Sequence, residues 1–192
     1  LTGRNAEITL DPTLLLDQNQ WRQIAVPYES STPFILCYYM PGDIIVNKSI
    51  TALAWQVSAL TGWRVICIGQ KEYMKLHPLR HSIFDAGPAE YLGLFQNASF
   101  VITNSFHGTA FSINYRKPFL VPINKNLPPG KALTSRITTL LSTLKLERRL
   151  IPAGESLPAG DVLNLDYRIA ETILQREKQK SISFLTDALV DF

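Results

Sequence analysis

The residues Phe100-Val101-Ile102-Thr103-Asn104-Ser105-Phe106-His107-Gly108-Thr109-Ala110 carry the clearest architectural signal in the chain, because an apolar segment runs straight into small polar residues. Val101 and Ile102 predict a buried strand, residues 103–109 its C-terminal turn, and residues 110–113 the first turns of a helix. A strand that leads into a helix in this way is typical of an open α/β sheet, which binds ligands at this edge. The stretch therefore predicts a fold class and the place of a site.

The rest of the chain alternates predicted strands and helices, which is the pattern of a parallel sheet with helices on both faces. Strands are expected at residues 6–10, 34–39, 64–68, 100–102 and 119–122. Helices are expected at residues 17–24 with Asp17 as N-cap, 45–61 closed by Gly62, 88–96, 135–144 with Ser135 as cap, and 166–189. Surface loops or connectors are expected at residues 71–86, 124–134 and 152–160. With 192 residues, 46% of them hydrophobic, the chain can bury the core of a single Rossmann-like α/β domain, residues 1–192.

Several turns of this layout are expected to meet at the C-terminal edge of the sheet, because residues 40–43, 103–108 and 124–135 each follow a strand. His107 would lie near a helix N-terminus, where free N–H groups favour an anion and an imidazole can move a proton. Arg136, at the start of the next helix, would point its guanidinium toward that anion. The alternatives stay open: His107 as a structural residue and Arg136 as a surface residue.

Composition excludes some functions. A net charge of +3 is too small for the basic stripe of a nucleic-acid-binding protein, and no apolar run is long enough to span a bilayer. Cys37 and Cys67 lie in apolar strands and lack metal-ligand spacing, which suits the reducing cytoplasm. No metal and no dissociable cofactor is indicated.

Four motifs in order resemble those of the polysaccharide pyruvyl transferase family. They are residues 104–113 followed by Lys117-Pro118-Phe119; residues 11–17 followed by Trp21; Ser135-Arg136-Ile137 with Leu140, Leu141, Leu144, Leu146 and Arg149; and Ser181-Ile182-Ser183-Phe184-Leu185 near the C-terminus. The resemblance implies a fold similar to the C-terminal domain of a glycosyltransferase type B architecture. The chain does not begin with methionine, so we expect it to be the C-terminal half of a longer enzyme whose N-terminal domain supplies the other wall of the active-site cleft.

The resemblance also implies a reaction in bacterial exopolysaccharide biosynthesis. Family members transfer the pyruvyl group of phosphoenolpyruvate to a sugar of a cell-surface polysaccharide or its lipid-linked precursor, forming a ketal and releasing phosphate. Such a site needs a proton donor and clamps for a carboxylate and a phosphate. His107 fits the donor role, since the charge of histidine changes near neutral pH.

The remaining site residues are predicted to hold phosphoenolpyruvate: Asn104, Ser105, Phe106, Gly108, Thr109, Lys125, Ser135 and Arg136. Asn104, Ser105, Thr109 and the N–H groups of Phe106 and Gly108 would form the clamp, and Gly108 would let the backbone approach the ligand closely. The ring of Phe106 is expected to pack into the core or to wall the pocket. Some family members carry arginine two residues before the histidine, where this chain has Ser105; Arg136 is our first choice as its substitute.

Two other functions remain open at this point. A nucleotide-sugar-dependent glycosyltransferase would use the same edge of the same fold, and a purine or uracil pocket would favour it. A non-catalytic anion- or carbohydrate-binding module is also compatible, because no convincing catalytic carboxylate lies near the motif. Asp43, Asp85 and Glu90 are candidates for a base, but each is explained more simply as a turn or helix-start residue. The base would then come from the other half of the enzyme.

Overall fold

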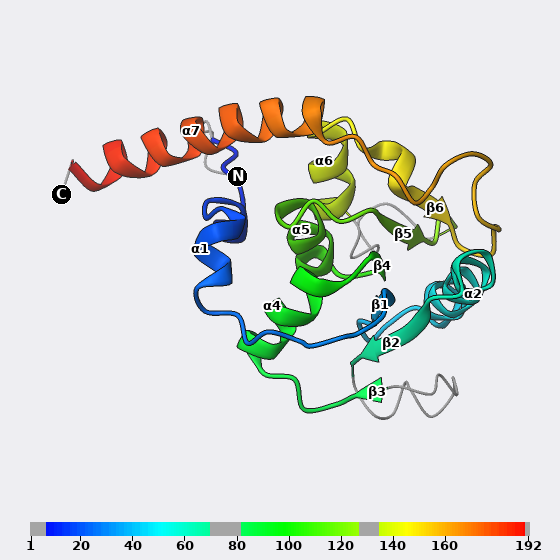
Figure 1. Cartoon of the computed structure of the whole chain (residues 1–192). Coiled ribbons are helices and arrows are strands. Elements are labelled where there is room, and N and C mark those ends of the chain that lie inside the picture. The colour runs from blue at the N-terminus through cyan, green and yellow to red at the C-terminus, as the bar shows by residue number, and fades with distance from the viewer. Residues whose placement is uncertain (1–6, 70–81, 127–134, 191–192) are drawn as a thin grey trace.

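A single parallel sheet organises the molecule, which we describe from a computed structural model for residues 7–69, 82–126 and 135–190 (Figure 1). Its six strands lie in the order β3-β2-β1-β4-β5-β6. They are β1 (Phe34–Tyr38), β2 (Arg64–Ile68), β3 (Ser82–Ile83), β4 (Phe100–Thr103), β5 (Phe119–Ile123) and β6 (Leu150–Pro152). Every adjacent pair is parallel. This is the strand order of the Rossmann fold, so the predicted α/β class is confirmed.

Helices cover both faces of this sheet. They are α1 (Gln18–Arg22), α2 (Ile44–Thr61), α4 (Pro88–Asn97), α5 (Phe106–Asn114), α6 (Ser135–Thr143) and α7 (Arg168–Val190), with 3₁₀ turns η1 (Pro12–Leu14) and η2 (Glu147–Arg149). Figure 1 shows α2 on one side of the strands and α4 and α5 on the other, with α7 crossing one end of the molecule.

The alternation of side chains along each strand builds two cores. Ile35 and Cys37 of β1 pack with α2, whereas Phe34 and Leu36 face α4 and α5. All four are fully buried. Since successive side chains of a strand point to opposite faces, a continuous apolar run such as Phe34-Ile35-Leu36-Cys37 marks a strand buried on both faces.

Most sequence-based elements are confirmed to within a few residues, and the caps explain their ends. Asp17 caps α1 through the N–H groups of Asn19 and Gln20. Gly62 ends α2 in the left-handed conformation, with φ of 72°. Ser135 is the first residue of α6 rather than its cap.

Three expectations about the elements were wrong. Residues 7–10 form no strand; the Leu10 N–H donates to Ser181 Oγ of α7 instead of a sheet partner. The turn after β4 is only two residues long, because Ser105 caps α5 and the helix starts at Phe106. The short strands β3 and β6 were not predicted; β3 lies in the expected loop 71–86, of which residues 70–81 are outside the described part of the chain.

No helix among the described residues is both long and apolar enough to cross a membrane. Cys37 and Cys67 are free, fully buried and directly opposite each other in the β1–β2 register.

Candidate functional site

The candidate site lies where the strand order reverses, between β1 and β4. The chain leaves β1 for α2 on one face and leaves β4 for α5 on the other, and such a divergence opens a ligand crevice at the carboxyl ends of parallel strands. His107 lies in the first turn of α5, at this edge. The sequence predicted a site at this edge of the sheet. The strand order shows that the predicted position lies beside the topological switch point, where the strand order reverses between β1 and β4.

Asn104 joins the two diverging loops. Its Oδ1 accepts a hydrogen bond from the Met40 N–H at 2.7 Å, and its Nδ2 donates to Met40 O at 3.2 Å and to Asn47 Oδ1 at 3.0 Å. The expected meeting of residues 40–43 with residues 103–108 is thereby confirmed. The sequence predicted that Asn104 holds phosphoenolpyruvate. In this structure its amide links the loop after β1 to the loop after β4.

Asp43 links the loop after β5 to the start of α2. Its Oδ2 accepts from Asn124 Nδ2 at 2.6 Å, and its Oδ1 accepts from the N–H groups of Ile45 and Val46 at the start of α2. Partial burial disfavours the charged carboxylate, but these hydrogen bonds outweigh it and lower the pKa of Asp43. An ionised carboxylate with both oxygens engaged serves as a helix cap and a tether.

The polar residues at the start of α5 form hydrogen bonds with one another. Thr103 Oγ1 accepts from the Ser105 N–H at 3.0 Å and donates to Tyr38 O at 2.9 Å. Ser105 Oγ accepts from the Gly108 N–H at 3.3 Å, and Thr109 Oγ1 donates to Ser105 O at 2.9 Å. Burial raises the pKa of Tyr38, and its hydrogen bond with the Ser105 side chain offsets this only in part.

Gly108 is needed for close packing inside the protein. A Cβ on it would lie 2.6 Å from Thr103 Oγ1, so the glycine lets α5 approach the end of β4. We expected Gly108 to free the backbone for a ligand and to offer its N–H; the structure places the glycine against Thr103 and gives the N–H to Ser105. The N–H groups of Phe106 and His107 precede it in the first turn, where an α-helix has no internal acceptor for them.

Three exposed or half-buried side chains gather at this helix start: Phe106, His107 and Arg136. The guanidinium carbon of Arg136 lies over the Phe106 ring, 4.6 Å from its centre, and the His107 ring centre lies 5.5 Å from that of Phe106 in an edge-to-face arrangement. A cation over an aromatic face is attracted by the ring quadrupole, so Phe106 holds Arg136 at the start of α5. Lys125 is exposed in the loop after β5, and no described contact joins it to this group.

Two large cavities border the site. A groove of about 640 Å³ lies beside Phe106, Ser135 and Arg136, between α6, α7 and residues 8–12. A second cavity, of about 550 Å³, lies at the ends of β1–β3 and is walled by Tyr38, Met40 and other residues. Either is large enough for a small molecule.

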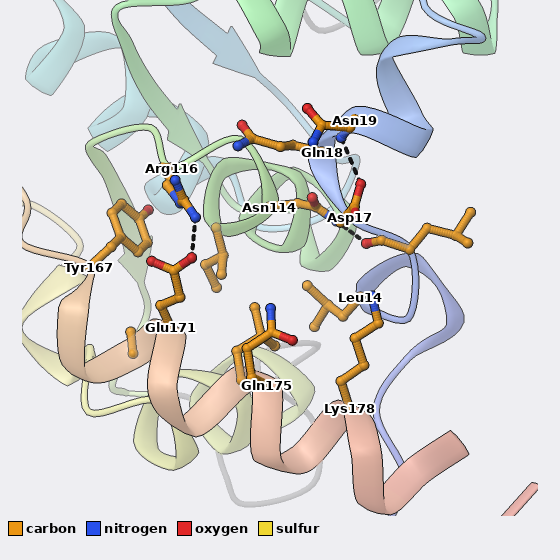
Figure 2. A pocket seen from close by; sticks show the side chains of 14 residues that line it. Leu14, Asp17, Gln18, Asn19, Asn114, Arg116, Tyr167, Glu171, Gln175 and Lys178 are labelled. Carbon is orange, nitrogen blue, oxygen red and sulfur yellow. Dashed lines mark hydrogen bonds and ion pairs between the residues drawn. The ribbon is translucent and has the colours of Figure 1, made fainter. Parts of the chain in front are cut away.

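A third, smaller cavity of about 210 Å³ lies between α1, α5 and α7 (Figure 2). Figure 2 shows Asn114 and Arg116, from the C-terminal end of α5 and just beyond it, with Arg116 paired to Glu171 of α7. Because His107 is at the opposite end of α5, this cavity is separate from the candidate site.

Sequence reasoning missed Asn47, Thr103 and Asn124, which hold the loops of the site together. Asn47 is only 3% exposed, in the first turn of α2. An asparagine directly after Ile44-Ile45-Val46 was a usable signal, because a buried amide needs partners. Across residues 7–69, 82–126 and 135–190, no three His, Cys, Asp or Glu side chains group closely enough to hold a metal ion.

A doubly wound sheet with helices on both faces defines the chain as an α/β protein of the Rossmann class, with His107 and Arg136 near its switch point. A family model described as polysaccharide pyruvyl transferase matches residues 1–125 of the chain. The chain therefore belongs to the polysaccharide pyruvyl transferase family. The matched region contains the His107 motif, whereas Arg136 and the C-terminal motif lie beyond it.

Several solved glycosyltransferases are similar to this chain. The kitacinnamycin glycotransferase has a TM-score of 0.44 at 14% identity, covering 82% of this chain and 42% of that chain. The dodecameric iron-containing heptosyltransferase TibC, in complex with ADP-D-beta-D-heptose, has a TM-score of 0.41 at 14% identity, and the match covers 97% of this chain and 50% of that chain. The E. coli ADP-heptose lps heptosyltransferase II has a TM-score of 0.40 at 10% identity, and the match covers 91% of this chain and 54% of that chain. The chain thus spans about half the length of these structures, and no curated protein sequence matches it.

Proposed function

We propose that this chain is the donor-binding half of a polysaccharide pyruvyl transferase, which moves the pyruvyl group of phosphoenolpyruvate onto a sugar of a cell-surface polysaccharide or its lipid-linked precursor. One observation carries the proposal: His107 is exposed in the first turn of α5 at the switch point, with Arg136 held over the neighbouring Phe106. Family membership supports the same reaction class.

The proposed chemistry assigns a task to each group. Protonation of the methylene carbon of phosphoenolpyruvate makes the adjacent carbon electrophilic, and one sugar hydroxyl adds there. A second hydroxyl of the same sugar then displaces phosphate, which closes the ketal and releases both hydroxyl protons. His107 supplies the first proton, and a base takes up those of the hydroxyls.

The anionic donor is held by the start of α5 and by Arg136. The N–H groups of Phe106 and His107 and the helix dipole favour a negative group there. Arg136 adds a planar donor fork suited to a carboxylate or a phosphate. Lys125 and Ser135, at the two ends of the connection from β5 to α6, stay proposed donor contacts.

The rest of the proposed enzyme follows from this assignment. We propose that an N-terminal domain of the same protein supplies the other wall and the base, because Asp43 is engaged as a helix cap and a tether. The buried free thiols of Cys37 and Cys67 suit a reducing compartment, so we expect the enzyme to act in the cytoplasm.

Isothermal titration with phosphoenolpyruvate, beside UDP- and GDP-sugars, tests the donor. We expect selective binding of phosphoenolpyruvate, weakened about tenfold, or about 1.4 kcal/mol, by Arg136→Ala. Arg148→Ala is the matched control, because Arg148 is an exposed arginine of η2. In the full-length enzyme His107→Ala should lower turnover by about 10²-fold or more, with little change in thermal stability.

Other outcomes would change the assignment. Binding of a nucleotide sugar instead would support the glycosyltransferase alternative. Equal losses of folding and of activity in His107→Ala would make His107 a structural residue, and unchanged donor affinity in Arg136→Ala would remove that arginine from the site.

A further inference from the structure

The groove of about 640 Å³ beside Phe106 has a lining unlike that of the anion site. It runs between residues 8–12, α6 and α7, and Phe106 and Arg136 belong to its wall. Because Phe106 contacts the ring of His107, the groove and the proposed donor site share a wall. A molecule in the groove would therefore lie next to the proposed reaction centre.

One wall of the groove carries a row of hydroxyl groups. Ser135, Thr139 and Thr143 all line it, and their spacing of four residues places them on one face of α6. All three are exposed, and no hydrogen bond of the described structure occupies the hydroxyls of Thr139 and Thr143. Thr138, one residue away, instead donates its hydroxyl to Ser135 O. The row therefore offers free groups that both donate and accept.

The charges around the groove balance. Arg136 and Lys180 contribute two positive charges, and Asp11 and Glu177 contribute two negative ones. This mixture does not favour an anion, unlike the start of α5, and carboxylates beside ammonium and hydroxyl groups match a neutral ligand rich in hydroxyls.

The groove also has an apolar side. Leu14, Leu140 and the Phe106 ring line it, and these surfaces suit the C–H groups of a ring. A ligand with an apolar body and many hydroxyl groups on its rim is a saccharide. Its volume lies within the range of small-molecule sites.

We propose that this groove binds the acceptor saccharide, with the hydroxyl row of α6 along its rim and Phe106 against its ring. The role as acceptor site rests on the proposed pyruvyl transfer, which needs two hydroxyls of one sugar beside the donor. Saccharide binding itself rests only on the lining of the groove.

Saturation-transfer NMR on this chain with methyl galactopyranoside, glucopyranoside and mannopyranoside tests the inference. Thr139→Trp fills the groove from α6, while Ser142→Trp places the same ring at an exposed position of that helix that does not line the groove. We expect saturation transfer to at least one glycoside in the original chain and in Ser142→Trp, and at least a tenfold loss of affinity in Thr139→Trp.

Transfer that survives in Thr139→Trp, or is absent from the original chain, would overturn the proposal. Thermal unfolding of both variants checks that they fold; we expect little change, because both positions are exposed. Titration of the same samples with phosphoenolpyruvate separates the two assignments. If glycosides bind in the groove but phosphoenolpyruvate does not bind, the assignment of phosphoenolpyruvate as donor is refuted and the saccharide site is retained. If phosphoenolpyruvate binds but no glycoside does, only the saccharide site is refuted.

Discussion

Gly108 shows how tightly the start of α5 is fitted to the end of β4. The Cβ of Gly108→Ala would lie 2.6 Å from Thr103 Oγ1 and 3.0 Å from its Cγ2. Thr103 is fully buried and bonded to Ser105 and Tyr38, so it cannot turn away cheaply. Alanine gains about 1 kcal/mol of helix propensity over glycine, but we expect the clash to win, with a net loss of about 1–3 kcal/mol in urea denaturation.

Gly87→Ala is the control for adding a Cβ that meets only a flexible side chain; because Gly87 is the N-cap of α4, where alanine is less favourable than glycine, a small loss is expected there. There the nearest atom to a new Cβ is the carboxylate end of Glu90, a flexible side chain that can move aside. A loss at Gly108 no larger than that at Gly87 would contradict the packing argument.

Single residues also mark the limit of prediction from this sequence. His107 was placed correctly near a helix start, because a local pattern of strand, turn and helix fixes its position. Asn104 was assigned to the donor, but its partners Met40 and Asn47 lie in another loop. Those contacts depend on β1 lying next to β4, which no local pattern in the sequence reports.

Among the elements, helix α2 depends on Asp43 both for its cap and for its link to the loop after β5. Removing the cap with Asp43→Ala should cost about 1 kcal/mol of unfolding free energy at pH 7. Asp43→Asn keeps a side-chain acceptor for the N–H groups of Ile45 and Val46, but it removes the charge and replaces the oxygen that accepts from Asn124, so it reports the charge and that tether together.

The pH dependence of the Asp43 contribution has a definite sign. The pKa of the folded carboxyl lies below its ordinary value of 3.8, so the unfolded chain takes up the proton first as the pH falls. The stabilisation is present above about pH 4 and is lost as the pH falls through the folded pKa. Urea denaturation from pH 7 to pH 3 should show the advantage over Asp43→Asn shrinking below about pH 4; a constant difference would contradict this.

Most elements that sequence patterns identified are long or deeply buried; the short helix α1 was indicated instead by its cap, Asp17. Residues 44–61 and 168–190 carry many helical turns, and β1 is an apolar run between clear turn residues. Strands β3 and β6 span two and three residues, which is too short for an alternation to be read. β3 forms by pairing with β2, and β6 forms by pairing with β5, so the residue pattern within each short strand does not predict it.

At the scale of the whole molecule, α7 attaches the N-terminal segment, residues 7–10, to the rest of the domain. Figure 1 shows α7 passing close to that segment. The Leu10 N–H donates to Ser181 Oγ at 2.9 Å, and Ser181 is 2% exposed. Lys180 adds an exposed ion pair to Glu7 at 3.1 Å, which contributes little by itself. The part-buried hydrogen bond is therefore expected to contribute more to the attachment.

Ser181→Ala should loosen this attachment without disturbing the sheet. It removes the acceptor of the Leu10 N–H and should cost about 1–3 kcal/mol in the local opening free energy of that segment. Amide hydrogen exchange is the measurement: the Leu10 amide should exchange faster by about tenfold or more, while amides of β1 and β4 keep their protection. Ser183→Ala, at an exposed position two residues along α7, should change neither. Equal acceleration in segment and sheet would mean that α7 stabilises the whole domain as one unit, and unchanged exchange at Leu10 would mean that packing alone holds the segment.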